Sequence, residues 1–348
     1  MSDESVQERV CVLGLGQMGL CCAGILMSPD RGGQTPEVRV WGHDEGEVGR
    51  LAQMRESDRL PGFHLPEGVR VSLRDGEALE GATLIVNAVP VQFIREAWTR
   101  LRDAVPRGAG VVSVSKGIEN RTLLRPTQIV AEVLGDDPDG APRPLAALSG
   151  PTIATELAKG LPATVTIASD DEPFALRLQR LFSTSYLRVY TNPDLLGVEL
   201  AGATKNVIAI AAGIIDGLAA GNNAKSALLA RGLAEITRLG VAMGANASTF
   251  GGVSGVGDLA TTCFSPEGRN RSCGEALGRG ESLDGYLARS PHVVEGVATT
   301  TSVIDLARKY RVEMPIAEAV RRVLFDGLDP VDAIGLLMSR ELKREVAD

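Results

Sequence analysis

The stretch VCVLGLGQMG, residues 10–19, decides the fold that the rest of the chain must fit. Its first four residues, Val10–Leu13, form a short apolar run that is typical of a buried strand. The glycines Gly14, Gly16 and Gly19 follow in the spacing G-x-G-x-x-G, and a helical pattern begins within this motif. Between a strand and a helix, this spacing predicts a turn whose backbone N–H groups hold the phosphates of a dinucleotide.

Further apolar runs, separated by helical patterns, continue through the first half of the chain. Continuous apolar runs that alternate with helices are typical of a parallel sheet covered on both faces. We therefore predict a Rossmann-type doubly wound sheet, which binds ligands beyond the carboxyl ends of its strands. The further strands are expected at Val38–Trp41, Leu84–Ala88, Gly110–Val114, Leu145–Leu148 and Ala163–Ala168.

The character of the sequence changes after Pro193. From Leu195 to Gly244 the chain consists mainly of helix formers with Gly and Ala, and helical patterns continue through Ile316–Leu324. We predict the fold class α/β plus all-α, with a dinucleotide-binding domain over residues 8–191 and an all-helical substrate domain over residues 192–342. A length of 348 residues agrees with two domains of about 100–200 residues each.

Composition argues against several classes of function. The net charge is −8 and aromatic residues make up 4%, so nucleic acid is not an expected partner. Five cysteines and three histidines, without metal-binding spacing, indicate a reducing compartment and no metal site. The polar start MSDESVQERV does not resemble a targeting segment, and the longest apolar stretch, Asn206–Ile215, is too short to span a membrane. We expect a cytoplasmic protein with small-molecule ligands.

The residues after the second predicted strand bear on the choice of cofactor. An extended loop precedes this strand, and Trp41-Gly42-His43-Asp44 follows where an acidic residue usually binds the ribose of NAD. His43 favours a 2′-phosphate, although it also fits an ordinary loop position, whereas Asp44 suits the ribose hydroxyls. NAD and NADP therefore both stay open, with NADP favoured.

Two polar segments follow predicted strands at the edge where such sheets bind ligands. Lys116 comes directly after the strand that begins at Gly110 and is placed to hold an anion or a nicotinamide; the alternative is a surface lysine. The turn Ser149–Ala154 offers backbone N–H groups to a phosphate. In addition, Ser149 or Thr152 is expected to cap the helix that follows.

Lys205 is the best candidate for proton transfer. It lies in Leu200–Ile215, a helical run dominated by Ala, Gly, Val and Ile. Partial burial would lower the pKa of its ammonium toward neutrality and suit it to acid–base chemistry; a place at the solvent edge is the alternative. Asp258, on the glycine-rich turn Gly255–Asp258, would orient this ammonium or else cap a helix.

A basic cluster completes the set of candidates. Gly268-Arg269-Asn270-Arg271-Ser272 puts two arginines at an expected helix start, which predicts an anion site. A solvated group of charges is the competing interpretation. The cluster is the more notable because the protein is acidic.

These segments, in this order, resemble the soluble, biosynthetic type of NAD(P)-dependent glycerol-3-phosphate dehydrogenase. The resemblance implies hydride transfer between NAD(P)H and dihydroxyacetone phosphate, a phosphate ester, to give sn-glycerol 3-phosphate for glycerophospholipid synthesis. We also expect a homodimer formed through the helical half. The resemblance runs from Val10 to about Leu337 and rests on residues 115–119 (SKGIE), 149–152 (SGPT), 203–209 (ATKNVIA), 231–235 (RGLAE), 255–259 (GVGDL), 268–271 (GRNR) and 294–296 (VEG).

The resemblance also implies the residues of the site. Lys205 is the implied proton donor and acceptor. The implied substrate site comprises Lys116, Gly150, Thr152, Lys205, Asp258, Gly268, Arg269 and Asn270. The cofactor site comprises the glycine turn and the implied contacts, namely Gly14, Gly16, Gln17, Met18, Gly19, His43, Lys116, Ala154, Arg269, Val293 and Glu295.

One pair of residues departs from the family pattern. Gln17 and Met18 stand where the family has a small polar residue and an aromatic one, and G-x-G-x-M-G looks more like the β-hydroxyacid dehydrogenases. A β-hydroxyacid dehydrogenase acting on a carboxylate is therefore one alternative, and a nucleotide-sensing protein without turnover is another. The Gly268–Ser272 cluster and the Gly255–Asp258 turn favour the phosphate ester.

Overall fold

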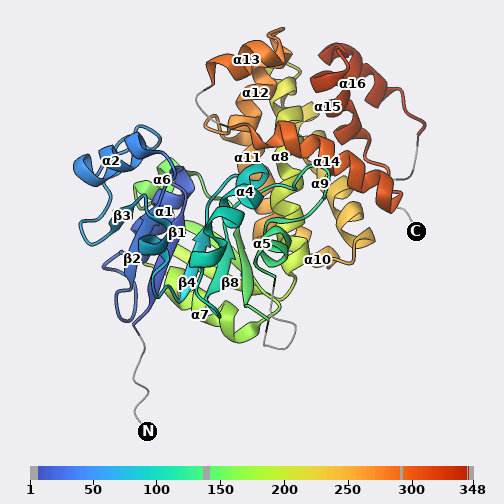
Figure 1. Ribbon diagram of the computed structural model, residues 1–348. Coiled ribbons are helices and arrows are strands. Elements are labelled where there is room, and N and C mark those ends of the chain that lie inside the picture. Colours follow the sequence, from blue (N-terminus) through green and yellow to red (C-terminus); the bar gives the residue numbers. More distant parts are fainter. Residues whose placement is uncertain (1–6, 136–141, 291–292, 343, 345–348) are drawn as a thin grey trace.

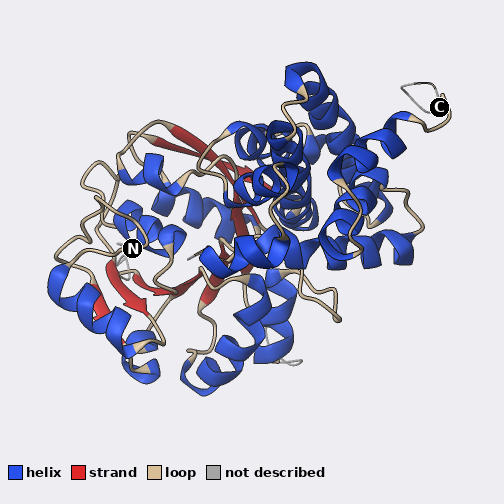
Figure 2. Ribbon diagram, turned by 90° about the horizontal axis from the view of Figure 1, so that it is seen from above, coloured by secondary structure: helices blue, strands red, loops and turns tan. Residues whose placement is uncertain are grey.

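The computed structural model describes residues 7–135, 142–290, 293–342 and 344. The first half of the chain forms an eight-stranded sheet flanked by helices, and the second half forms a cluster of helices beside it (Figures 1 and 2). The predicted fold class is confirmed.

The sheet has the strand order β3-β2-β1-β4-β5-β6-β7-β8. From β1 the chain runs outward to β2 and β3, and then returns to the other side of β1 at β4. The turns after β1 and β4 therefore point apart and leave the crevice in which such sheets bind ligands. The strands are β1 (Arg9–Leu13), β2 (Glu37–Trp41), β3 (Arg70–Ser72), β4 (Leu84–Asn87), β5 (Gly110–Ser113), β6 (Leu145–Ser149), β7 (Ala163–Ala168) and β8 (Leu187–Asn192).

Helices cover both faces of the sheet and bury separate apolar cores. On one face, α1, α2, α6 and α7 pack on strand residues that include Val12 and Val86. On the other, α3, α4 and α5 pack on Leu13 and Ile85. These helices are α1 (Gln17–Leu26), α2 (Glu45–Met54), α3 (Asp75–Leu79), α4 (Val91–Leu101), α5 (Pro126–Leu134), α6 (Ala154–Ala158) and α7 (Glu172–Phe182).

Three features of the sheet differ from the prediction. β6 and β7 are antiparallel, and the segment that joins them contains only the five-residue helix α6. β8 was not predicted: it alternates buried residues such as Leu187 with exposed ones such as Arg188, the pattern of an edge strand. β3 was also missed, because three residues carry little pattern.

The helical half is built around α8. This helix is long and apolar enough to cross a membrane, yet 94% of its most apolar window is buried inside the molecule, as in the core helix of a soluble protein. The helices are α8 (Leu195–Gly217), α9 (Gly221–Ala242), α10 (Ala247–Phe250), α11 (Asp258–Phe264), α12 (Arg269–Gly278), α13 (Leu283–Arg289), α14 (Glu295–Tyr310), α15 (Pro315–Phe325) and α16 (Pro330–Met338).

Helices α8 and α12 pack backbone against backbone. A Cβ atom on Gly213 would lie 1.9 Å from the carbonyl oxygen of Arg271, and one on Gly274 would lie 1.9 Å from that of Ile210. Only glycine permits so close an approach. The first turn of α12 is therefore fixed relative to the middle of α8.

Candidate active site

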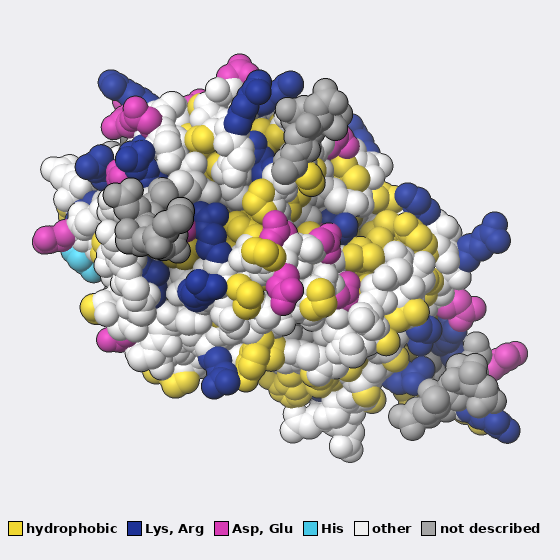
Figure 3. All heavy atoms as spheres, turned by 90° about the horizontal axis from the view of Figure 1, so that it is seen from below, with side chains coloured by type: hydrophobic (Ala, Val, Ile, Leu, Met, Phe, Trp, Pro, Cys, Tyr) yellow, Lys and Arg dark blue, Asp and Glu magenta, His cyan; other side chains and the backbone are white. Residues whose placement is uncertain are grey.

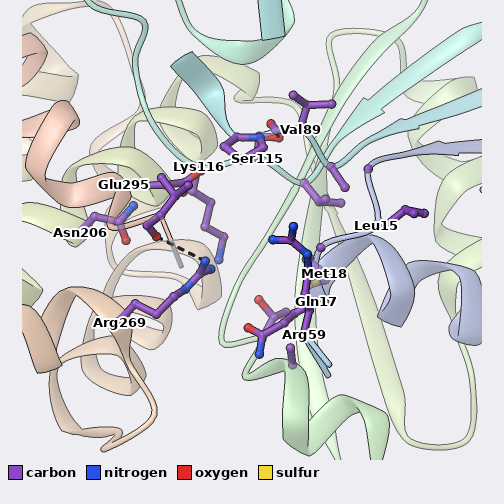
Figure 4. A pocket seen from close by; sticks show the side chains of 18 of the residues that line it. Leu15, Gln17, Met18, Arg59, Val89, Ser115, Lys116, Asn206, Arg269 and Glu295 are labelled. Atoms are coloured by element: carbon purple, nitrogen blue, oxygen red, sulfur yellow. Dashed lines mark hydrogen bonds between the residues drawn. The ribbon is translucent and has the colours of Figure 1, made fainter. Parts of the chain in front are cut away.

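A cavity of about 660 Å³ lies between the edge of the sheet and the helical half. In Figure 4, Leu15, Gln17 and Met18 line one side of it, and Asn206 and Arg269 face them from the other. Its walls come from the turn after β1, the segments after β2, β4, β5 and β6, and the helices α8, α11, α12 and α14. Both halves of the molecule thus contribute to one site.

The glycine turn has the geometry that its sequence predicts. Gly14 has a φ of +110° and its N–H donates to the carbonyl oxygen of Trp41 at 2.9 Å. No atom lies within 4 Å of the place where a Cβ of Gly16 would be, so a ligand can approach this backbone closely. Gly19 does not line the cavity; a Cβ there would lie 2.1 Å from the oxygen of Gly14, so its role is the tight turn. The turn and the start of α1 therefore fit a dinucleotide pyrophosphate.

A buried carboxylate bridges two lysines. Lys205 Nζ on α8 donates to Asp258 Oδ1 at 2.5 Å and to Thr262 Oγ1 at 2.5 Å. Lys116 Nζ, from the segment after β5, donates to Asp258 Oδ2 at 2.6 Å and to the carbonyl oxygen of Gly150 at 3.0 Å. Asp258 therefore joins a lysine of the sheet half to a lysine of the helical half.

The charges of this cluster are strongly perturbed. Lys205 is only 6% exposed, and burial lowers its pKa to about 8; the Lys116 ammonium acts in the same direction and Asp258 opposes them. Burial alone would raise the pKa of Asp258, but the two ammonium groups hold it below its usual value. The solvent-edge interpretation of Lys205 is wrong. So is the capping interpretation of Asp258, since Gly257 is the N-cap of α11.

The start of α12 presents an arginine and an asparagine to the cavity. Gly268 is its N-cap and Arg269 its first residue, and both line the cavity. Among the described residues no carboxylate forms an ion pair with Arg269, whose guanidinium donates to the carbonyl oxygen of Val293 at 3.4 Å. Asn270 accepts from the N–H of Gly296 at 2.9 Å, which leaves its NH₂ group for a ligand.

The second arginine of the predicted basic cluster does not join this site. Arg271 Nε donates to Asp216 at 2.7 Å, and Lys225 donates to the same carboxylate at 2.7 Å. Ser272 donates to the carbonyl oxygen of Pro266 at 3.4 Å. Neither Arg271 nor Ser272 lines the cavity, because the helix turns them away from it. The start of α12 therefore presents one arginine to the cavity instead of the predicted two.

The turn after β6 also differs from the prediction. Ile153 is the N-cap of α6 and no side chain caps the helix, because the hydroxyl of Thr152 turns back to the carbonyl oxygen of Gly150 at 3.2 Å. Ser149 donates to the bridging carboxylate at 3.4 Å. Gly150 does not line the cavity and contributes only its carbonyl oxygen, which holds Lys116.

Most residues implied for the cofactor line the cavity. Asp44 does not reach it, because its carboxylate accepts from the N–H of Glu47 at 2.7 Å and caps α2. The lining includes Gly14, Gly16, Gln17, Met18, His43, Lys116, Ala154, Arg269, Val293 and Glu295. Burial raises the pKa of Glu295, although Arg269 and Lys116 oppose the shift.

Several lining residues were missed in the sequence. Thr262 follows Asp258 by one helical turn, so the spacing alone could have placed both on one face of α11. Asn206 is adjacent to Lys205, and Ser115 precedes Lys116 and donates to the carbonyl oxygen of Val89. Among the described residues, no group of three or more His, Cys, Asp or Glu is arranged to hold a metal.

A dinucleotide turn that faces a buried lysine and an anion-binding helix start defines a nicotinamide-dependent dehydrogenase for a small anionic substrate. The chain belongs to the NAD-dependent glycerol-3-phosphate dehydrogenase family. The N-terminal family model matches residues 9–175 and the C-terminal one residues 194–335.

Individual relatives agree along almost the whole chain. It is 42% identical over 342 residues to glycerol-3-phosphate dehydrogenase [NAD(P)+] of Bacillus pumilus, covering 98% of this chain and 97% of the relative. It is 44% identical to that of Geobacter sp., covering 97% and 99%. The crystal structure of the Coxiella burnetii glycerol-3-phosphate dehydrogenase superposes with a TM-score of 0.89 at 34% identity, covering 96% and 99%. These relatives do not favour the β-hydroxyacid dehydrogenase alternative.

Proposed function

We propose that this protein interconverts dihydroxyacetone phosphate and sn-glycerol 3-phosphate with NAD(H) or NADP(H). The observation that carries the proposal is the pair of contacts of Asp258, 2.5 Å to Lys205 and 2.6 Å to Lys116. This cluster lies in the same cavity as the glycine turn and the anion site of α12. A small phosphate ester and a dinucleotide can therefore meet beside a buried ammonium.

Lys205 is the proposed proton donor. Its ammonium has three N–H bonds, of which Asp258 and Thr262 accept two, so one is left for the C2 carbonyl oxygen of the substrate. A pKa of about 8 keeps the group mainly protonated near neutrality, yet acidic enough to release the proton to an alkoxide. The bound nicotinamide supplies the hydride. Lys205 stabilises the charge that develops on the oxygen, transfers its proton and is left as a neutral amine.

The phosphate of the substrate is assigned to the start of α12. The guanidinium of Arg269, the amide of Asn270 and the free backbone N–H groups of the first turn converge there. Binding energy from the phosphate would hold the three-carbon unit beside Lys205. The Lys116 ammonium favours the ionised form of Asp258. Asp258 and the carbonyl oxygen of Gly150 accept two of its N–H bonds, so the third is left for the substrate.

The cofactor is assigned to the sheet side of the cavity. Gly14 and Gly16 leave backbone free for the pyrophosphate, and Gln17 and Met18 lie beside them (Figure 4). The departure of Gln17 and Met18 from the usual family residues leaves this turn intact, since both still stand at the entrance to α1. His43, at the end of β2, lies at the ribose end of such a site.

The first experiment measures the loss of reduced-nicotinamide absorbance when dihydroxyacetone phosphate is added to the protein with NADH or NADPH. Lys205→Met should lower kcat by about 10²–10⁴-fold and leave cofactor binding unchanged. Lys309→Met, which removes an exposed lysine of α14, is the matched control and should turn over normally. Normal turnover by Lys205→Met would remove this lysine from the chemical step. No oxidation by the wild-type protein would refute the reaction.

We further propose a cytoplasmic homodimer that supplies glycerophospholipid synthesis. Helix α16 exposes Val331, Leu336 and Met338, an apolar surface suited to a second copy. The five cysteines are free and buried, which suits a reducing compartment. On the face shown in Figure 3, basic, acidic and hydrophobic side chains are interspersed. Sedimentation should give a dimer, and Met338→Glu should give monomers; a monomeric wild type would refute the assembly.

A further inference from the structure

An ion pair lies in the cavity wall beyond the second strand. Arg59 Nε donates to Glu47 Oε1 at 2.5 Å, and its terminal nitrogen donates to Oε2 at 3.2 Å. Both residues line the cavity together with His43. The side chain of Arg59 is 48% exposed, and in Figure 4 it lies on the side of Gln17, across from Arg269.

The position of this pair matches the ribose end of the cofactor site. In a doubly wound sheet the adenosine ribose lies at the end of the second strand, where a carboxylate usually accepts from its hydroxyls. Here that strand ends in Trp41, and His43 follows in place of the acid. Glu47, in the first turn of α2, supplies a carboxylate at the ribose end of the cavity, and this carboxylate is already paired with the Arg59 guanidinium.

The other charged groups at this end are engaged elsewhere or carry the opposite sign. Arg100 donates to both carboxylate oxygens of Asp75 at 2.9 Å, and its guanidinium lies 5.3 Å from the ring centre of Trp41. Glu96 lines the wall as an exposed acid. Of the arginines around the ribose end, Arg59 is the one whose partner also lines the cavity.

We propose that the Glu47–Arg59 pair sets the preference between the two cofactors: Arg59 binds the 2′-phosphate of NADP(H), and Glu47 competes with that phosphate for the guanidinium. Glu47 takes the fork formed by Nε and one terminal nitrogen of Arg59. A phosphate on the remaining terminal nitrogen would lie close to the Glu47 carboxylate, and repulsion between the two like charges makes the anions compete for the guanidinium. Without a 2′-phosphate, Arg59 stays on Glu47 and NAD(H) binds unhindered. This inference rests on the proposed function for the identity of the cofactor.

The test uses nucleotide binding alone, so it does not depend on the reaction. Calorimetric titration of the intact protein with 2′,5′-ADP and with 5′-AMP gives the ratio of the two affinities, and this ratio isolates the 2′-phosphate. Glu47→Gln should raise the ratio by about tenfold, because the competing charge is lost. Arg59→Gln should lower it by about tenfold, and Arg59→Lys should give an intermediate value, because it keeps the charge without the planar fork.

Two variants of α2 serve as matched controls. Glu45→Gln and Arg50→Gln remove the same charges from exposed positions that do not line the cavity, and both should leave the ratio unchanged. An equal loss of both nucleotides in Arg59→Gln would place Arg59 on the pyrophosphate or the adenine and overturn the inference. A ratio unchanged by Glu47→Gln would also overturn it. If the affinity ratios behave as expected but the wild-type protein does not reduce dihydroxyacetone phosphate with NADPH, only the proposed reaction is refuted.

Discussion

At the scale of single residues, the site depends on one carboxylate that serves two ammonium groups. Residue types and their surroundings predicted Lys205, Asp258 and Arg269, because charged side chains within apolar or glycine-rich segments stand out in a sequence. The contact of Lys205 with Thr262 and the ion pair of Arg59 could not be predicted in this way. Each depends on a distance between side chains that no local pattern records.

The lowered pKa of Lys205 predicts opposite pH dependences for the two directions of the reaction. The ammonium form, which reduction needs, prevails below a pH of about 8, and the neutral amine, which oxidation needs, prevails above it. The kcat of reduction should therefore fall as the pH rises through about 8, while that of oxidation should rise. Rate profiles at saturating substrate check this, and parallel profiles in both directions would contradict the assignment.

Asp258→Asn tests the bridging carboxylate. Removal of its charge takes away the group that opposes the lowering of the Lys205 pKa, so the midpoint of the reduction profile should move to lower pH. Two buried ammonium groups would also lose their partner, which should cost about 3 kcal/mol of unfolding free energy. Denaturant titration measures this cost. Asp284→Asn, an exposed acid of α13, is the control, and an unmoved midpoint would argue against the coupling.

At the scale of elements, the periodicity of the sequence predicted most of what positions the site. The strands before the glycine turn, before Lys116 and before Ser149 all form, because each is a continuous apolar run buried on both faces. The antiparallel pairing of β6 and β7 could not be predicted, because an apolar run indicates a buried strand but not its direction relative to its neighbour. The close contact of α8 with α12 could not be predicted either, since glycines in a helical pattern do not indicate which helix packs against them.

Gly274→Ala tests the contact between α8 and α12. The new methyl group would lie 1.9 Å from the carbonyl oxygen of Ile210, so the helices must separate. We expect a loss of about 2–3 kcal/mol of unfolding free energy and a higher KM for dihydroxyacetone phosphate, with little change in the KM for the cofactor. Thermal unfolding and steady-state kinetics check both effects.

The matched control for this prediction is Gly49→Ala in α2. No atom lies within 4 Å of the Cβ position there, so the variant should be more stable by about 0.5–1 kcal/mol because of its higher helix propensity. If Gly274→Ala behaved like this control, the backbone contact would not determine the position of the phosphate site.

At the scale of the whole molecule, the cavity lies between the sheet half and the helical half of the chain. The last strand ends at Asn192 and α8 begins at Leu195. This change supports a division of the chain into domains 8–191 and 192–342, which stays a prediction. Local patterns could predict the two halves separately, but not that Lys116 and Asp258 would form an ion pair across the boundary.

Because residues of both halves line the cavity, ligands that bind there should stabilise the protein as a unit. NADPH at 100 times its dissociation constant should raise the unfolding free energy by about 2.7 kcal/mol. Thermal unfolding with and without NADPH measures this, and adenosine, which lacks the phosphates, is the control. A melting temperature that does not respond to NADPH would show that the glycine turn does not bind it.

The glycine contact between α8 and α12 also fixes a distance within the helical half. Lys205 lies on α8 and Arg269 on α12, and the backbones of these two helices are in contact. The distance between the proposed carbonyl and phosphate sites is therefore set within one pair of packed helices. A movement of the helical half relative to the sheet would change the distance from the substrate to the cofactor. It would not change the distance between the carbonyl and phosphate sites. If Lys205 and Arg269 bind the substrate as proposed, we expect the crossing of α8 and α12 to select phosphate esters by chain length, in addition to the side chains that contact the substrate.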